Sequence, residues 1–186
     1  PDYDFPTKEE IVNIMQAAKD VEATTATEEI KAVPLLDYEV EGGKIVKTKP
    51  IRMLNAEEWT LTNGCKVYYK FCDQNRIKVS LLGESSGGMS LLPAENLPSA
   101  SALSTLAMYS GLYKHDVQMM QEILKGYHVQ PNITLGETFE GVSGVCDNNE
   151  MEMLLQIIYL LFEHPRFDQN DFEKFVYLNR LQAENT

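Results

Sequence analysis

Cysteine and long apolar runs are scarce in this sequence of 186 residues. The three cysteines, Cys65, Cys72 and Cys146, form no C-x-x-C pair, so the sequence predicts neither a disulfide framework nor a zinc knuckle. The longest apolar run, residues 153–162, is interrupted by Gln156 and is far shorter than the roughly 20 residues that span a bilayer. We therefore expect no membrane insertion.

Basic residues are outnumbered, and the formal net charge is -12. A surface of this sign repels phosphate backbones, which argues against nucleic acid as a partner. The hydrophobic fraction of 44% is nevertheless sufficient for a core, so the chain is expected to be globular.

Histidine is scarce too. His115, His128 and His164 are the only imidazoles, and none has a second ligand one helical turn away on the same helix. The Gly-rich segment 83–88 lacks the lysine of a phosphate-binding loop, and its two serines are not in a G-x-S-x-G elbow. The sequence thus predicts no catalytic, cofactor-binding or metal-binding residue in this chain, and we expect it to bind no zinc.

The first part of the chain is expected to be an arm, residues 1–57. Thr7 and Glu10 have capping-box spacing before an apolar stripe of helical period, which predicts an amphipathic helix over residues 8–22. Residues 23–50 mix charge, threonine, proline and a Gly-Gly pair, which is typical of an extended tether. The stripe needs a partner surface, either on a domain not present here or on a second copy in a homodimer.

Residues 58–186 alternate between strand and helix patterns. Strands are predicted over residues 58–61 and 66–71, joined by a turn at Asn63-Gly64, and over residues 77–82 as the next antiparallel neighbour. Further extended segments at residues 127–131, 133–135 and 138–146 are expected to join the same sheet.

Four helices are predicted between and after these strands. They cover residues 98–110 with a stop at Gly111, 116–125 capped by Asp116 with a stop at Gly126, 150–163 capped by Asn148 or Asn149, and a last one capped by Asp168 with Phe172, Phe175, Val176 and 178–181 buried. The fold class is α+β: two layers, a mainly antiparallel sheet with helices packed on one face.

Four stretches together carry a family resemblance: EWTLTNGCKVYYK, IKVSLLGESSGGMSLLP, LPSASALSTLAMYSG and EMEMLLQIIYLLFEHPRFDQNDFEKF. In this order they resemble one processing-peptidase-like repeat of the pitrilysin/insulinase family of zinc metallopeptidases, the inverzincins, over roughly residues 58–180. The arm before them resembles the linker between repeats. A repeat of this family would continue beyond Thr186.

The resemblance implies that the helix before Gly111 is where a catalytic repeat carries H-x-x-E-H, two zinc ligands and a general base. Here Ala102, Thr105 and Leu106 stand in those places, and no register supplies a histidine. The family's third ligand is a downstream glutamate. We expect the glutamates in that part of the chain to be solvated or cap-forming charges: Glu137, Glu140, Glu150 and Glu152.

The resemblance therefore implies a degenerate, non-catalytic repeat of a bacterial-type zinc endopeptidase. It would form part of a peptide-binding chamber opposite the catalytic repeat of the same polypeptide, which would hold the zinc and cleave peptides or unfolded proteins. The implied location is the periplasm or cell envelope of a bacterium. The alternative is a stand-alone, non-enzymatic binding or scaffolding module that kept the fold.

Overall fold

The computed structural model describes residues 6–20 and 33–184. The chain divides into two compact units, Pro1–Lys31 and Ala32–Thr186, and each is considered by itself. The structure thus places the division earlier than the end of the expected arm, while the assignment of residues 1–57 as an inter-repeat linker stays a prediction.

The first unit contains helix α1 (Lys8–Asp20), which confirms the predicted helix over the described residues; residues 21–22 lie outside them. The capping box is present, since the Thr7 backbone N–H donates to Glu10 Oε2 at 2.7 Å and the Glu10 N–H donates to Thr7 Oγ1 at 3.3 Å. The stripe residues Ile11, Ile14 and Met15 are 45%, 64% and 60% exposed, so they are not covered by the described residues of this unit.

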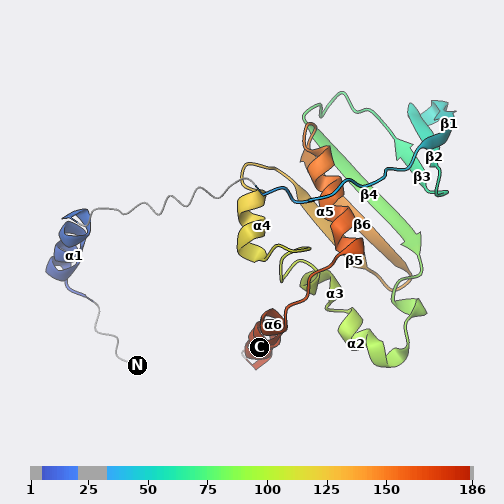
Figure 1. Ribbon diagram of the computed structural model, residues 1–186. Helices are drawn as coiled ribbons and strands as arrows, with labels where there is room; N and C mark the ends of the chain where they lie inside the picture. Colours follow the sequence, from blue (N-terminus) through green and yellow to red (C-terminus); the bar gives the residue numbers. More distant parts are fainter. Residues whose placement is uncertain (1–5, 21–32, 185–186) are drawn as a thin grey trace. The chain divides into compact units, whose positions relative to one another are not determined.

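Two three-stranded sheets and several helices make up the second unit (Figure 1). Its elements are β1 (Ile45–Ile51), η1 (Arg52–Leu54), β2 (Ala56–Leu61), β3 (Lys66–Tyr69), β4 (Lys78–Ser86), η2 (Gly88–Leu91), η3 (Ala94–Asn96), α2 (Leu97–Ala100), α3 (Leu103–Leu106), α4 (Val117–Ile123), β5 (Gln130–Leu135), β6 (Phe139–Asp147), α5 (Met151–Glu163) and α6 (Gln169–Glu184). All strand pairs are antiparallel, which confirms the α+β fold class.

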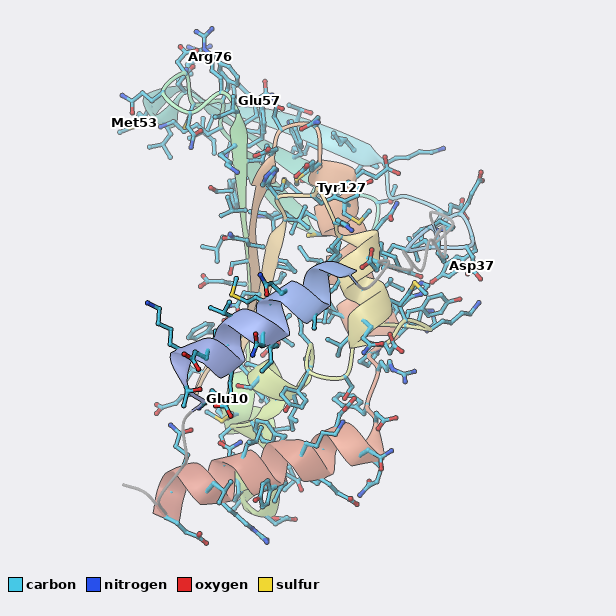
Figure 2. All side chains as sticks on the ribbon, turned by 90° about the vertical axis from the view of Figure 1, so that its left-hand side faces the viewer. Glu10, Asp37, Met53, Glu57, Arg76 and Tyr127 are labelled. Carbon is cyan, nitrogen blue, oxygen red and sulfur yellow. The ribbon has the colours of Figure 1, made fainter. Side chains whose placement is uncertain are left out.

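The first sheet has the order β1-β2-β3 and contains the predicted hairpin. Its turn takes positive φ at Gly64 (+85°) and not at Asn63, whose side chain instead accepts a hydrogen bond from the Cys65 N–H at 3.0 Å. Strand β1 comes from the expected tether, so part of that arm is paired backbone. Figure 2 labels Glu57, which lies on β2 of this sheet, and Met53, which lies on the adjoining η1 and is 98% exposed.

The second sheet has the order β4-β6-β5, and this corrects the expectation of one continuous sheet. Strand β4 pairs along its whole length with β6, from Lys78 opposite Asp147 to Ser86 opposite Phe139. A nine-residue strand makes more ladder hydrogen bonds with a nine-residue partner than with the four-residue β3. Proximity in sequence therefore did not decide the pairing.

Residues 98–110 were predicted to form one continuous helix, and this prediction is wrong. The segment forms only the four-residue helices α2 and α3, followed by turns that end at Gly111 with φ +89°. Ser101 Oγ donates to the Pro98 carbonyl at 2.7 Å, and backbone bonds alternate between the three-residue and four-residue spacing. Small hydroxyl side chains that bond the backbone weaken a helix, which accounts for the breaks.

The other helices follow their predicted limits closely. Asp116 caps α4 by accepting from the Met119 N–H at 2.8 Å, and Asp168 caps α6 by accepting from the Asn170 N–H at 2.9 Å. The predicted cap of α5 is wrong, because Glu150 occupies the cap position and makes no side-chain cap bond. The expected buried side of α6 is only partly covered, since Phe175 and Val176 are half-buried and no residue of this helix is fully buried.

The core lies between α5 and the second sheet. Its most buried side chains, each at most 2% exposed, are Leu35, Ala107, Leu112, Cys146, Leu154, Ile157 and Leu160. Helix α5 crosses β5 and β6 (Figure 1), and the approach is close: a Cβ at Gly144 would lie only 2.6 Å from Leu154 Cδ1. A glycine at this position lets the helix approach the strand.

Residues 33–38 hold the start of the second unit against this core. Leu35 is 2% exposed, and its carbonyl lies 3.3 Å from His115 Nε2. Asp37 accepts hydrogen bonds from Tyr113 Oη at 2.9 Å and from Lys114 Nζ at 2.5 Å. These bonds, first the one from Lys114, lower the pKa of Asp37. We call residues 33–38 the strap.

Candidate functional site

The segment that corresponds to H-x-x-E-H contains no side chain that binds zinc. Thr105 and Leu106 lie on α3 and Ala102 directly precedes it; Thr105 is exposed and the other two are half-buried. Zinc in proteins is bound by imidazole, thiolate or carboxylate donors, and these side chains offer none. The catalytic zinc implied by the resemblance therefore does not fit this segment, and no chemical step is derived from it.

The Gly-rich segment does not form an anion-binding loop either. Residues 83–86 belong to strand β4, and the N–H of Gly88 donates to the carboxylate of Glu140. A backbone donor that is already bound to a carboxylate is not free to bind a phosphate. Glu140 is thereby shown to have a structural partner, whereas Glu137 and Glu152 are exposed as expected.

The structure does bring together a group that the sequence did not predict. Among the described residues, the one cluster of three potential metal ligands is His128, Asp147 and Glu150, whose ligand atoms all lie within 4.8 Å of one another. His128 precedes β5, Asp147 ends β6, and Glu150 stands at the start of α5. Three elements that meet at one end of the core therefore supply one donor each.

The distances within this cluster are those of an ion-pair network. His128 Nδ1 lies 3.2 Å from Asp147 Oδ2 and 3.9 Å from Glu150 Oε1. Lys78 Nζ contacts the other Asp147 oxygen, Oδ1, at 2.5 Å. The hydrogen bond from Lys78 lowers the pKa of Asp147, so its carboxylate stays ionised at neutral pH.

Glu150 was expected to be a solvated or cap-forming charge; it stands at the cap position of α5, but it is not solvated and its side chain makes no cap bond. The residue is 8% exposed, and its Oε2 accepts the backbone N–H of His128 at 2.8 Å. The neighbouring Cys146 is buried, and burial, followed by the negative charges of Glu150 and Asp147, raises the pKa of its thiol. Cys146 is therefore a protonated core side chain.

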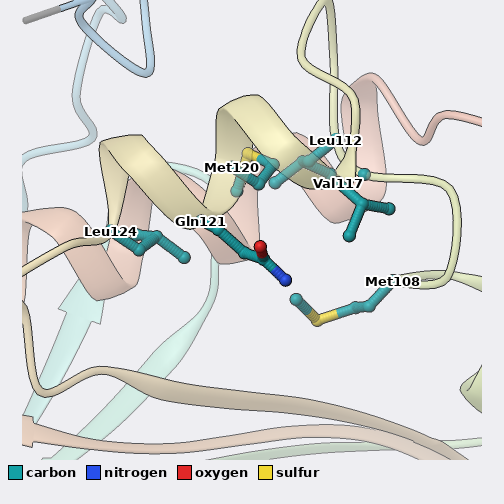
Figure 3. Close-up of a pocket in the computed structure, with 7 residues that line it drawn as sticks. Met108, Leu112, Val117, Met120, Gln121 and Leu124 are labelled. Atoms are coloured by element: carbon teal, nitrogen blue, oxygen red, sulfur yellow. The ribbon is translucent and has the colours of Figure 1, made fainter. Parts of the chain in front are cut away.

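An apolar pocket of about 340 Å³ lies beside α4 (Figure 3). Its lining consists of Met108, Gly111, Leu112, Val117, Met120, Gln121 and Leu124. Gln121 is the one polar side chain in that lining, and no ionisable group contributes to it. The pocket has the chemistry to accept an apolar group but not to catalyse a reaction.

Within the described residues, no helix combines the length and apolar character needed to cross a membrane. No family model and no curated protein matches the sequence. Solved structures do match it in fold, among them two proteases.

The first is a mutant of the ferredoxin protease FusC in complex with Arabidopsis ferredoxin, with a TM-score of 0.69 and 24% identity over 98% of this chain. The second is the periplasmic protease PqqL from Escherichia coli, with a TM-score of 0.72 and 15% identity over 97% of this chain. This chain spans 20% of the length of each.

The likeness extends beyond residues 58–180, where the sequence placed it, because nearly the whole chain is covered. It is a likeness of fold at low identity, and it agrees with the pitrilysin/insulinase-like layout predicted from the sequence. The chain has the α+β fold of about one fifth of the FusC and PqqL proteases.

Proposed function

We propose that this chain is a non-catalytic domain of a bacterial-type zinc metalloendopeptidase. The observation that carries the proposal is the combination of this protease fold with Ala102, Thr105 and Leu106 at the places of H-x-x-E-H. The zinc and the general base would belong to a catalytic repeat in the same polypeptide. This domain would then supply wall surface to the peptide-binding chamber opposite that repeat.

The substrate of the whole enzyme would be a peptide or an unfolded protein. FusC is described as a ferredoxin protease and its structure contains a ferredoxin, which supports a protein as substrate. PqqL is described as periplasmic, which supports the periplasm or cell envelope as the location. The net charge of -12 would favour basic peptides through long-range attraction, which salt screens beyond about 10 Å at roughly 0.1 M.

The test begins with the longer polypeptide that contains these residues. We expect an H-x-x-E-H repeat in its reading frame, chelator-sensitive peptidase activity, and no activity from the 186-residue chain alone. Replacing the glutamate of that motif by glutamine should give an inactive enzyme that still binds substrate. A photoreactive group placed far from the scissile bond of a bound peptide should then cross-link to residues 32–186.

A matched peptide with the photoreactive group next to the scissile bond should cross-link to the catalytic repeat instead. A reading frame without H-x-x-E-H would contradict the proposal and favour the stand-alone binding module. Cross-links that never reach residues 32–186 would contradict the chamber role even in an active enzyme.

A further inference from the structure

The donor atoms of the cluster at the start of α5 are close enough together to hold a metal ion as well as an ion pair. Bonds from zinc to nitrogen or oxygen ligands are about 2.0–2.2 Å long, so neighbouring ligand atoms in a tetrahedral site are roughly 3.4 Å apart. His128 Nδ1 lies 3.2 Å from Asp147 Oδ2 and 3.9 Å from Glu150 Oε1, and all three atoms are within 4.8 Å of one another. The two measured separations lie on either side of that spacing.

Both carboxylates are already oriented by bonds to their outer oxygens. Asp147 Oδ1 is held by Lys78 Nζ, and Glu150 Oε2 is held by the backbone N–H of His128. Each carboxylate therefore presents its second oxygen to the same imidazole nitrogen. Side chains that bind metals are usually oriented by hydrogen bonds of this kind, which position the donor atoms before the ion binds.

Charge and access also favour a cation. The side chain of Glu150 is 9% exposed, and a buried carboxylate is costly unless it is compensated. Two carboxylates face one ammonium, so the cluster is negative by one charge when the imidazole is neutral. The side chain of His128 is 68% exposed, which leaves a path from solvent and room for water to complete the coordination.

We propose that His128, Asp147 and Glu150 bind one divalent transition-metal ion through Nδ1, Oδ2 and Oε1, with Zn²⁺ as the best-matched ion. One imidazole with two carboxylates suits Zn²⁺ better than Mg²⁺ or Ca²⁺, which select oxygen ligands. Cys146, although adjacent in sequence to Asp147, is 0% exposed and belongs to the core, so it is not counted as a fourth ligand. The ion joins the starts of β5 and α5 to the end of β6.

This site is independent of the proposed protease role, because none of its ligands lies in the segment 102–106. It departs from the expectation, drawn from the sequence, that this chain binds no metal. Its function is structural: the bound ion stabilises the folded chain by mass action.

The test uses the 186-residue chain after treatment with a chelator and removal of that chelator. Calorimetric titration with Zn²⁺ should give one ion per chain, and the ion should raise the melting temperature. His128→Ala and Asp147→Asn should each weaken binding by about tenfold or more. His164→Ala, an exposed histidine outside the cluster, should leave the affinity unchanged.

Lys78→Gln provides a second, opposite readout. Removal of the ammonium frees Asp147 Oδ1 and removes a competing positive charge, so Zn²⁺ should bind more tightly. Far-UV circular dichroism checks that each variant is folded. No Zn²⁺ binding, or binding that survives His128→Ala in a folded chain, would overturn the proposal.

Discussion

Replacement of Leu35 by alanine tests whether the strap is part of the folded core. Leu35 is 2% exposed and belongs to the same core cluster as Leu112 and Ile157. The change removes three carbons, worth about 2.4 kcal/mol at roughly 0.8 kcal/mol per buried methylene. The cavity left behind adds to this, so we expect the free energy of unfolding to fall by about 3–4 kcal/mol.

The measurement is urea unfolding followed by circular dichroism, with unchanged dependence on urea concentration as the sign of a pure stability change. Val40→Ala is the control, because Val40 follows the strap and is 42% exposed. It should change the free energy of unfolding by about 0.5 kcal/mol or less. A loss below about 1 kcal/mol for Leu35→Ala would show that residues 33–38 are a tether, as the sequence predicted, and that the core does not need them.

Three more outcomes follow from particular contacts. The folded-state pKa of Asp37 is lowered, so the contribution of Asp37 to stability is complete above its unfolded pKa near 4 and is lost as the pH falls through the lower folded value. Asp37→Asn should therefore lower the free energy of unfolding at pH 7 and not at strongly acidic pH. A difference in unfolding free energy between the two proteins that is constant with pH would refute this. Gly88→Ala should lower the free energy of chemical unfolding by about 2 kcal/mol or more, because Gly88 has φ +62° and the new Cβ would lie 2.6 Å from the backbone N and O of Phe139. Gly42→Ala is the control and should be neutral, because nothing lies within 4 Å of its new Cβ. Amides of α1 should exchange hydrogen much faster than those of α5, since the stripe of α1 is exposed in its own unit; strong protection in a demonstrated monomer would contradict it.

Features that depend on a few neighbouring residues were predictable from the sequence. The capping box at Thr7, the caps at Asp116 and Asp168, and the positive φ of Gly111 and Gly126 are all present. In each case one side chain or one glycine satisfies backbone groups within a turn of itself. Such arrangements depend little on the rest of the fold.

Pairing over long sequence separations was not predictable in the same way. The alternating pattern identified β4, but its partner β6 begins more than 50 residues later, and several strands offered equivalent faces. The cluster shows the same limit. His128 and Glu150 are 22 residues apart and meet through a backbone hydrogen bond, so no ligand spacing marked them. The usable signal was weak: a histidine just before one strand, and an acid between the end of another and the following helix.

Helix α6 separates what an amphipathic pattern predicts from what it does not. Its apolar residues recur at helical spacing, and the helix forms as expected, yet Phe172, Tyr177 and Leu178 are 47%, 62% and 53% exposed. The spacing fixes which side chains share a face, because that depends only on the 3.6-residue period. Whether the face is buried depends on a second surface. Among the described residues that surface covers four residues of α5 fully, whereas on α6 it leaves Phe175 half-buried, against the ring of Tyr109 at 5.7 Å. A pattern read from one segment therefore establishes the secondary structure and leaves the packing partner open.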